Sequence, residues 1–283
     1  MITTLSNSNL IATINHKGAE LVSLLNSSEI EYIWDGNSAF WGKHSPVLFP
    51  IVGTLKNNQY EYNGKTYSLS RHGFARDMEF ELIENSKNHV VFSLTHSEET
   101  LRCYPFEFEL QIHYILLDND LEIVYHVINK NSFAMPFSIG AHPAFALSKA
   151  FDDYQILFEK EEKLVVYPLE NDLISDKTIE LPMIKNTLPL TYSLFKNDAL
   201  ILKKIQSKYV DIIEKNIPLL RIRFDDFPSL GIWTKNNAPF ICIEPWLGYS
   251  DTIEKSGNLF EKEGIQILNS GEKFEAKFNI EIF

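Results

Sequence analysis

Hydrophobic and polar residues alternate along several segments of the chain. In residues 106–114 (FEFELQIHY) every second residue is apolar, and residues 273–282 (KFEAKFNIEI) repeat this pattern near the C-terminus. Successive side chains of a strand point to opposite faces, so alternation with period two predicts a strand with one buried face. We therefore expect half-buried strands in both segments.

Turn signals join neighbouring strands into hairpins. Residues 121–128 (LEIVYHVI) follow the first of these strands after the turn-rich stretch 117–120 (LDND). Residues 60–67 (YEYNGKTY) contain Asn63-Gly64, a dipeptide whose positive φ angles suit a two-residue type I′ turn. Because such signals recur along the chain, the sequence predicts many antiparallel strands.

Helical patterns are few and short, with candidates at residues 38–41, 98–102 and 193–196. Strands do not alternate with helices, and no linker, repeat or low-complexity tract divides the chain. We therefore expect an all-β, mainly antiparallel fold with a few short helices. The predicted architecture is a large sandwich or barrel, formed by a single domain over residues 1–283.

Charge and composition narrow the range of partners. The chain has 26 Lys+Arg against 38 Asp+Glu, a net charge of −12, and its basic residues form no run. We therefore expect neither nucleic acid nor an anionic membrane as a partner. The N-terminal segment lacks a signal-peptide pattern, and no apolar run approaches the ~18 residues of a spanning helix, so we expect no targeting or anchoring segment.

The two cysteines, Cys103 and Cys242, are far apart in the sequence and belong to no CxxC motif. This spacing predicts neither a disulfide framework nor a thiolate zinc site. A cysteine-poor chain is typical of a reducing compartment. We therefore expect a cytoplasmic protein.

Four segments interrupt apolar stretches with polar residues. The first, residues 70–77 (SRHGFARD), places Arg71, His72 and Arg76 around a glycine. A solvated polar loop is one interpretation. The other is a binding site, because glycine lets the backbone approach a ligand closely.

The other three segments each contain one ionisable group in an apolar setting. His142 lies in residues 138–145 (SIGAHPAF), where it is either a core histidine or a general acid. Glu244 interrupts the apolar strand of residues 241–246 (ICIEPW), so its carboxylate must be paired, hydrogen-bonded or raised in pKa. Asp198 precedes an apolar strand, where a turn or cap role is the alternative to a site.

Several mechanisms lack their sequence motifs. There is no HExxH or similar metal spacing, no GxSxG followed by a histidine, no P-loop and no GxGxxG after a first strand. We therefore expect no metal and no cofactor. The remaining chemistry is acid–base catalysis by Glu244 with His142, or with His72.

Taken together and in order, these segments resemble the aldose 1-epimerase (galactose mutarotase-like) superfamily, and within it the branch related to LacX. The resemblance covers nearly the whole chain and rests on Trp41 and on residues 45–53 (SPVLFPIVG), 72–76 (HGFAR), 140–145 (GAHPAF), 197–200 (NDAL) and 244–246 (EPW). It implies the family's β-supersandwich, in which two large, mostly antiparallel sheets curve around a sugar cleft.

The resemblance also implies an activity, the interconversion of the α and β anomers of a free aldose, and a role for each residue. Glu244 resembles the general base that deprotonates the C1 hydroxyl, and His142 resembles the general acid that protonates the ring oxygen. The residues expected to bind the sugar are His72 near the ring oxygen, Asp198 on the hydroxyls, and Arg76 and Arg71 along the pocket. Apolar surfaces for the sugar are expected from Trp246, Phe74 and Phe145, with a plain core role as the alternative.

One departure leaves the substrate open. Relatives commonly carry an arginine after the FPIVG stretch, where this chain has Thr54-Leu55-Lys56. One alternative is a hexose-6-phosphate mutarotase, for which the basic candidates are Arg76, Arg71, Lys43 and Lys56. Another is a sugar-binding or sensing protein without catalysis, which would not need both an acid and a base. We expect a small-molecule sugar as ligand, and a monomer or homodimer.

Overall fold

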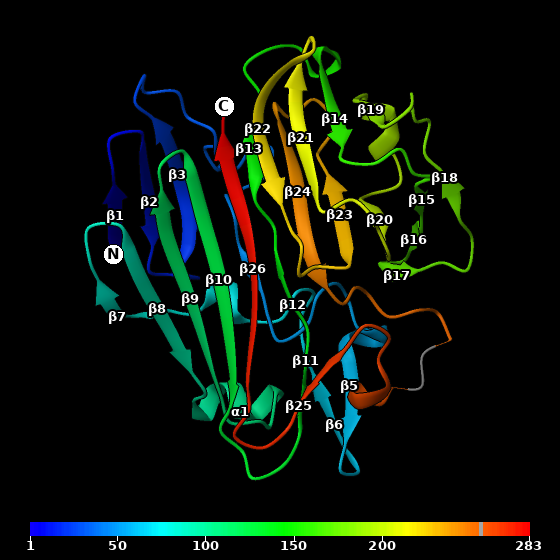
Figure 1. Cartoon of the computed structure of the whole chain (residues 1–283). Coiled ribbons are helices and arrows are strands. Elements are labelled where there is room, and N and C mark those ends of the chain that lie inside the picture. Colours follow the sequence, from blue (N-terminus) through cyan, green and yellow to red (C-terminus); the bar gives the residue numbers. More distant parts are fainter. Residues whose placement is uncertain (255–256) are drawn as a thin grey trace.

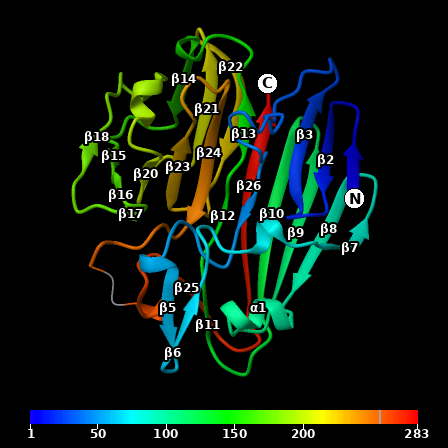
Figure 2. The ribbon, with the colours of Figure 1, turned by 180° about the vertical axis from the view of Figure 1, so that it is seen from behind.

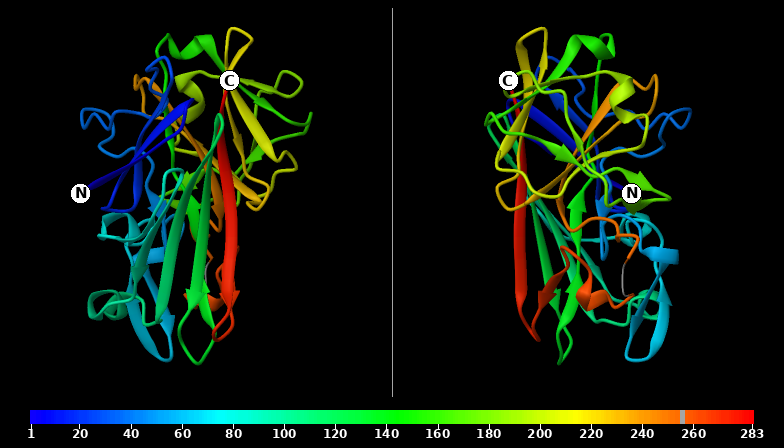
Figure 3. Two further views of the ribbon diagram at one scale, coloured as in Figure 1. Left: turned by 60° about the vertical axis from the view of Figure 1, so that its left-hand side comes forward. Right: turned by 90° about the vertical axis from the view of Figure 1, so that its right-hand side faces the viewer.

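Two large antiparallel sheets dominate the computed structural model, which describes residues 1–254 and 257–283 (Figure 1). The larger sheet has nine strands in the order β19 (Thr187–Pro189), β14 (Tyr154–Phe158), β21 (Tyr209–Glu214), β22 (Ile217–Arg223), β26 (Lys273–Ile282), β10 (Asp120–Asn129), β9 (Phe108–Leu117), β8 (His89–Thr95) and β7 (Glu81–Asn85). Figure 3 shows β26, in red, beside the long green strands β9 and β10.

The second sheet has six strands. Five follow the order β20 (Leu200–Leu202), β23 (Ser229–Trp233), β24 (Phe240–Leu247), β12 (Ile139–Ala141) and β4 (Val47–Leu48), and β13 (Ala144–Ala146) also pairs with β24. Seen from behind in Figure 2, β24 and β23 lie next to each other. Strand β24 is therefore the centre of this sheet, with neighbours on both edges.

Smaller sheets surround these two. They are β1 (Ile2–Ser6), β2 (Leu10–Asn15) and β3 (Glu20–Asn26), and the pairs β5 (Gln59–Tyr62) with β6 (Lys65–Ser68), β11 (Met135–Phe137) with β25 (Gln266–Leu268), β15 (Val165–Val166) with β18 (Ile179–Glu180), and β16 (Leu169–Glu170) with β17 (Leu173–Ile174). Helical structure consists of α1 (Glu98–Cys103) and 3-10 turns at Lys56–Asn58, Ala75–Asp77, Phe151–Asp153, Tyr192–Phe195 and Leu259–Glu261. Within the described ranges, no helix has the length and apolarity needed to cross a membrane. The predicted mainly antiparallel all-β class is confirmed.

The sequence patterns account for the long strands. Buried and half-buried residues alternate along β9, β9 and β10 form the predicted hairpin, and β26 pairs with β10 in antiparallel register. Asn63 and Gly64, with φ of 48° and 71°, form the turn between β5 and β6. Of the three predicted helices, residues 98–102 lie in α1, residues 193–196 form mostly 3-10 structure, and residues 38–41 form only a turn.

Alternation along β24 gives the six-stranded sheet two different faces. Ile241 and Ile243 point into the main hydrophobic core, which also contains the buried residues of β9 and β10. Phe240, Cys242 and Trp246 pack in separate, smaller clusters on the opposite face. Glu244 is two residues from Cys242 and two residues from Trp246, so its side chain points to this second face and away from the main core.

Candidate active site

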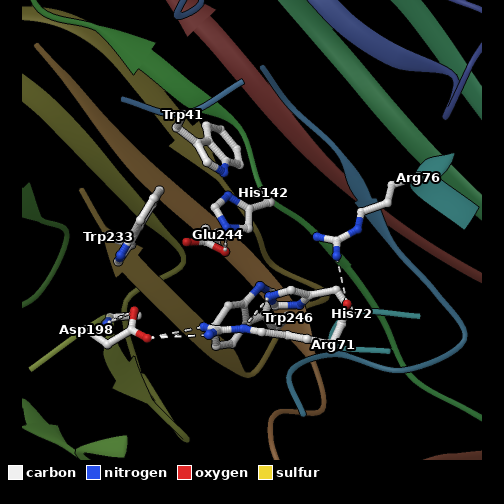
Figure 4. A pocket seen from close by; sticks show the side chains of 10 residues that line it. Trp41, Arg71, His72, Arg76, His142, Asp198, Trp233, Glu244 and Trp246 are labelled. Atoms are coloured by element: carbon white, nitrogen blue, oxygen red, sulfur yellow. Dashed lines mark hydrogen bonds and ion pairs between the residues drawn. The ribbon is translucent and has the colours of Figure 1, made fainter. Parts of the chain in front are cut away.

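A pocket of about 280 Å³ lies on this second face of the six-stranded sheet (Figure 4). Pockets for small molecules usually measure ~300–1,000 Å³, so this pocket suits a small ligand. The two expected catalytic residues line it, as do five of the residues expected to bind the sugar, and its full lining is Trp41, Arg71, His72, Arg76, His142, Asp198, Ala199, Trp233, Glu244 and Trp246.

Strand β24 places Glu244 and Trp246 side by side on the pocket face. The Trp246 indole extends over two glycines on the neighbouring strands, Gly140 on β12 and Gly231 on β23. A Cβ atom at either glycine would lie 2.6 Å from an indole carbon. The two glycines therefore leave the space in which Trp246 forms the floor of the pocket.

Glu244 and His142 form a buried pair. The Nε2 atom of His142 lies 3.3 Å from Oε2 of Glu244, and the two residues are only 8% and 1% exposed. The backbone N–H of His142 donates to the carbonyl of Pro46, which anchors the residue just after β12. Among the described residues, His142 Nδ1 and Glu244 Oε2 have no partner that meets hydrogen-bond geometry.

Burial shifts both groups towards their neutral forms. Desolvation raises the pKa of Glu244 well above its usual value, and Arg71 opposes this shift. The pKa of His142 is lowered to about 3, mainly by desolvation, with Arg76 and Arg71 acting in the same direction. Burial therefore favours a carboxyl beside a neutral imidazole over a carboxylate beside an imidazolium.

Aromatic rings enclose His142. Trp41 stacks on its imidazole with ring centroids 4.7 Å apart and planes at 25°, and Trp233 contacts the imidazole edge-on at 5.8 Å. The Trp34 indole N–H donates to the carbonyl of Trp41 at 2.8 Å and fixes that segment. From the sequence, Trp41 entered only through the family resemblance and Trp233 did not stand out, because these contacts join segments far apart in the chain.

His72 is held by a tight loop. Its φ is +69°, and the φ of the next residue, Gly73, is +71°. A Cβ atom at Gly73 would lie 2.2 Å from the carbonyl oxygen of Phe49, so only glycine fits there. The backbone N–H of Gly53 donates to Nδ1 of His72. Burial lowers the pKa of His72 well below its usual value, and His142, Arg71 and Arg76 act in the same direction. His72 is therefore neutral.

Arg71 and Asp198 face each other across the pocket entrance (Figure 4). Two guanidinium nitrogens of Arg71 lie 3.5 Å from Oδ2 of Asp198, and one lies 3.1 Å from Oδ1 of Asp172. Asp198 has φ of +78°, and its Oδ1 accepts from the N–H of Ala199. These groups are partly exposed, so they offer both donors and acceptors to a polar ligand.

Arg76 lies on the other side of the pocket. Its Nη2 donates to the carbonyl of Arg71 at 2.8 Å, and its Nε lies 3.6 Å from Oδ2 of Asp77. Within residues 1–254 and 257–283, that Nε has no hydrogen-bond partner. Because that Nε is buried and ion-paired with Asp77, any contact of Arg76 with a ligand falls to its terminal guanidinium nitrogens.

Other expected residues lie outside the pocket. Phe145 is fully buried in the main core and Phe74 packs against it, so neither offers a surface to a ligand there. Lys43 pairs with Asp77, and Lys56 donates to the carbonyl of Ile253. Neither lysine lines the pocket.

Thr54 is likewise absent from the pocket lining. It is buried, its N–H donates to the Ser250 hydroxyl and its carbonyl accepts from the N–H of Asp251. The departure at residue 54 therefore leaves the pocket without an arginine donor from this segment.

One set of potential metal ligands occurs in the described part of the chain. Donor atoms of His142, Cys242 and Glu244 all lie within 4.8 Å of one another. The spacing of the cysteines predicted no thiolate site, because His142 and Cys242 are distant in the sequence. They meet because β13, the strand after His142, pairs with β24. Cys103 and Cys242 are both free thiols.

Comparisons with known proteins identify the family of this chain. The sequence matches the aldose 1-epimerase family over residues 1–281. The chromosomal LacX protein of Lactococcus lactis subsp. lactis is 35% identical over 275 residues, which cover 91% of each chain.

Two crystal structures are also similar. A galactose mutarotase-related enzyme from Lactobacillus acidophilus has a TM-score of 0.94 at 34% identity, covering 100% of this chain and 97% of the other. A galactose mutarotase-like protein from Lactobacillus casei has a TM-score of 0.95 at 34% identity and covers both chains fully. The two sheets described above thus form the galactose mutarotase-like β-sandwich, and the chain belongs to the aldose 1-epimerase family.

Proposed function

We propose that this protein is a mutarotase that interconverts the α and β anomers of a neutral aldohexose. The observation that carries the proposal is the buried Glu244–His142 pair in a pocket with polar and aromatic walls. Mutarotation needs one base and one acid acting on neighbouring oxygens, and it needs no redox cofactor. A carboxyl and an imidazole 3.3 Å apart match that requirement.

In the proposed reaction Glu244 removes the proton of the C1 hydroxyl while His142 protonates the ring oxygen. The bond between C1 and the ring oxygen breaks, and the open-chain aldehyde forms. Rotation about the C1–C2 bond then exposes the other face of the carbonyl. The reverse proton transfers close the ring to the other anomer.

The electrostatics of the pocket suit this cycle, because the pair carries one proton throughout. Ring opening converts a carboxylate and an imidazolium into a carboxyl and a neutral imidazole. Burial favours that second arrangement, as the raised pKa of Glu244 and the lowered pKa of His142 indicate. The pocket therefore stabilises the protonation state that accompanies the aldehyde, and hydrogen bonds from a bound sugar to the Glu244 carboxylate would favour its charged form before ring opening.

The remaining polar groups are suited to hold the sugar. We assign Arg71 and Asp198 to hydroxyl groups at the pocket entrance, Arg76 to a hydroxyl on the opposite side, and His72 to the neighbourhood of the ring oxygen. Trp246 and Trp233 offer apolar surfaces to the C–H groups of a pyranose.

Polarimetry of freshly dissolved α-glucose and α-galactose tests the proposal. The protein should accelerate the approach to anomeric equilibrium, and Glu244→Gln should lose ~10²–10⁴-fold of that acceleration while keeping its melting temperature. Absence of acceleration with every aldose and hexose phosphate would overturn the proposal. If saturation-transfer NMR then showed saturable sugar binding without anomeric exchange, a sugar-binding protein would be the better interpretation.

A hexose-6-phosphate mutarotase is the second candidate, because two arginines, Arg76 and Arg71, line the pocket. Against it, Arg71 is already paired with Asp198 and Asp172, and Lys43 and Lys56 lie outside the pocket. Arg76→Ala distinguishes the two candidates. It should reduce kcat/KM for a hexose 6-phosphate far more than for the neutral hexose only if the phosphate is the natural substituent.

We also propose a cytoplasmic location and a single domain over residues 1–283. The free thiols of Cys103 and Cys242 support the first, because a reducing compartment keeps such thiols unpaired. The family match over residues 1–281 supports the second.

A further inference from the structure

The pocket contains a second possible chemistry, because a thiol lies beside the acid–base pair. Cys242 is two residues before Glu244 on β24, so both side chains are on the same face of the sheet. His142 follows β12, the strand beside β24. One donor atom from each of these residues lies within 4.8 Å of the others.

The three donors are those that zinc prefers. Zinc binds cysteine sulfur, histidine nitrogen and carboxylate oxygen at ~2.0–2.3 Å in tetrahedral geometry, which places the donors roughly 3.3–3.7 Å apart. Because no pair of donor atoms here exceeds 4.8 Å, side-chain rotations that move them by about an ångström at most would complete the geometry.

Two of the three candidate ligands also have a side-chain atom without a hydrogen-bond partner. Glu244 Oε2 and His142 Nδ1 lack hydrogen-bond partners among the residues described, although both residues are more than nine-tenths buried. Buried polar atoms are usually satisfied by protein, water or an ion. Cys242 is fully buried and does not line the pocket, whereas His142 and Glu244 do, so an ion held by the three would be reached from the pocket through His142 and Glu244.

We propose that His142, Cys242 and Glu244 form an inhibitory zinc site. The Cys242 thiol and the Glu244 carboxyl release their protons to solvent as they bind the ion. Three protein ligands then hold the zinc, and the fourth position faces the pocket, where a water completes the coordination. Zinc bound there takes the lone pairs of both the imidazole and the carboxylate. Neither group can then transfer a proton to or from a sugar, so zinc stops anomer exchange without unfolding the protein.

Equilibrium dialysis with Zn²⁺ tests the binding directly and does not depend on any activity. The wild-type protein should bind one zinc. Cys242→Ala should weaken this binding by at least ~10–100-fold, since loss of even an outer partner of a ligand has that effect. Cys103→Ala is the matched control, because Cys103 is the other free cysteine and lies at the end of α1. It should bind zinc like the wild type.

Cobalt substitution tests the ligand identity. Co²⁺ added to the wild type should give a thiolate-to-cobalt charge-transfer band in the near ultraviolet, and Cys242→Ala should abolish it while Cys103→Ala retains it. If Cys242→Ala fails to fold, Cys242→Ser is used in both measurements, because serine is closer to cysteine in volume. Equal zinc affinity in the wild type and the Cys242 variant, or a cobalt spectrum without the thiolate band, would overturn the proposal.

The activity measurement comes last and separates this proposal from the function proposed above. If the protein is a mutarotase, zinc should inhibit the wild type and the Cys103 variant at concentrations that leave the Cys242 variant active. If it has no mutarotase activity, the dialysis and cobalt results still decide whether the site exists. A Cys242 variant inhibited by zinc as strongly as the wild type would overturn the inhibitory role.

Discussion

Gly53 and His72 exchange two hydrogen bonds. The N–H of His72 donates to the Gly53 carbonyl at 2.8 Å, and the N–H of Gly53 donates to Nδ1 of His72 at 3.1 Å. A second donor, Nε of Arg71, lies 3.3 Å from the other ring nitrogen. A neutral imidazole accepts at only one nitrogen. Since the Gly53 amide is fixed and the Arg71 side chain can turn away, we expect Nδ1 to accept and Nε2 to carry the hydrogen.

This assignment predicts the behaviour of His72 in solution. Nitrogen-15 NMR should find Nε2 protonated and Nδ1 unprotonated, with no change as pH falls from 8 to 5, because burial and the neighbouring cations lower the pKa of His72. His72→Asn should keep the fold, since asparagine tolerates a positive φ and its oxygen can accept from Gly53, but it should lower kcat. A hydrogen found on Nδ1 would contradict the assignment.

Trp41 is predicted to act as a positioning residue for His142. The stacked indole fixes the ring plane and excludes water from it. Trp41→Ala should therefore lower kcat by ~10–100-fold, in line with the cost of a misplaced catalytic group. Because water would then reach His142, its pKa should rise from about 3 towards the ordinary value.

Trp41→Phe provides the control for that experiment. A phenyl ring keeps an aromatic face against the imidazole, so this variant should retain most of the rate and the acid limb of the wild-type pH profile. If Trp41→Ala changed only KM and left both kcat and the pH profile unaltered, Trp41 would contact the sugar without positioning His142.

The two glycines beneath Trp246 are predicted to be intolerant of alanine. At Gly140 and at Gly231 an added Cβ would lie 2.6 Å from the indole. Overpacking of this kind costs ~1–3 kcal/mol, so each variant should unfold at lower denaturant concentration and lose activity as the indole is displaced. Gly42→Ala is the control, because its Cβ would have no neighbour closer than 3.7 Å. Equal stability of all three variants would show that the indole yields without penalty.

His113 is predicted to make the protein less stable in acid. It lies on β9 outside the pocket, and its pKa is lowered to about 4, mainly by burial, with His126 and His89 acting in the same direction. Between pH 6.5 and 4 the unfolded chain therefore binds more protons at this residue than the folded chain, and the free energy of unfolding falls as pH falls. The contribution of His113 to the free energy of unfolding is therefore fully present above pH 6.5 and is lost as pH falls towards 4.

Melting temperatures at pH 7 and pH 4.5 measure this effect. The wild type should lose more on acidification than His113→Gln, whose side chain does not titrate, and the rate of anomer exchange at pH 7 should be the same in both. An identical loss in the two proteins would mean that His113 is protonated in the folded state as readily as in the unfolded state.

How far the sequence predicted this molecule depends on the range of the interactions. Strands β9, β10 and β26 follow from a local alternation of apolar residues, and Glu244 and His142 stand out because each interrupts a local apolar pattern. The support for these groups is not local. Gly231 beneath Trp246, Trp41 against His142, and Cys242 near His142 each join segments far apart in the chain. Such contacts depend on strand order, which a periodic pattern does not specify.

The pH dependence of catalysis gives the strongest test of the one-proton pair. Activity requires that Glu244 and His142 together hold one proton. A second proton is bound only at low pH, because the pKa of His142 is lowered to about 3, and burial raises the pKa of Glu244, which moves loss of the single proton to higher pH than for an ordinary carboxyl. The rate above the spontaneous reaction should therefore stay level as pH falls from 8 to 5.

An ordinary histidine acid would behave differently. If the mechanism used a free imidazolium with the usual pKa near ~6.5, kcat/KM would change across the middle of this range. Measurements of anomer exchange in buffers of low catalytic power, with the spontaneous rate subtracted at each pH, distinguish the two cases. A transition near pH 6.5 that disappears in His142→Gln would show that His142 titrates independently of Glu244, and the coupled pair would have to be abandoned.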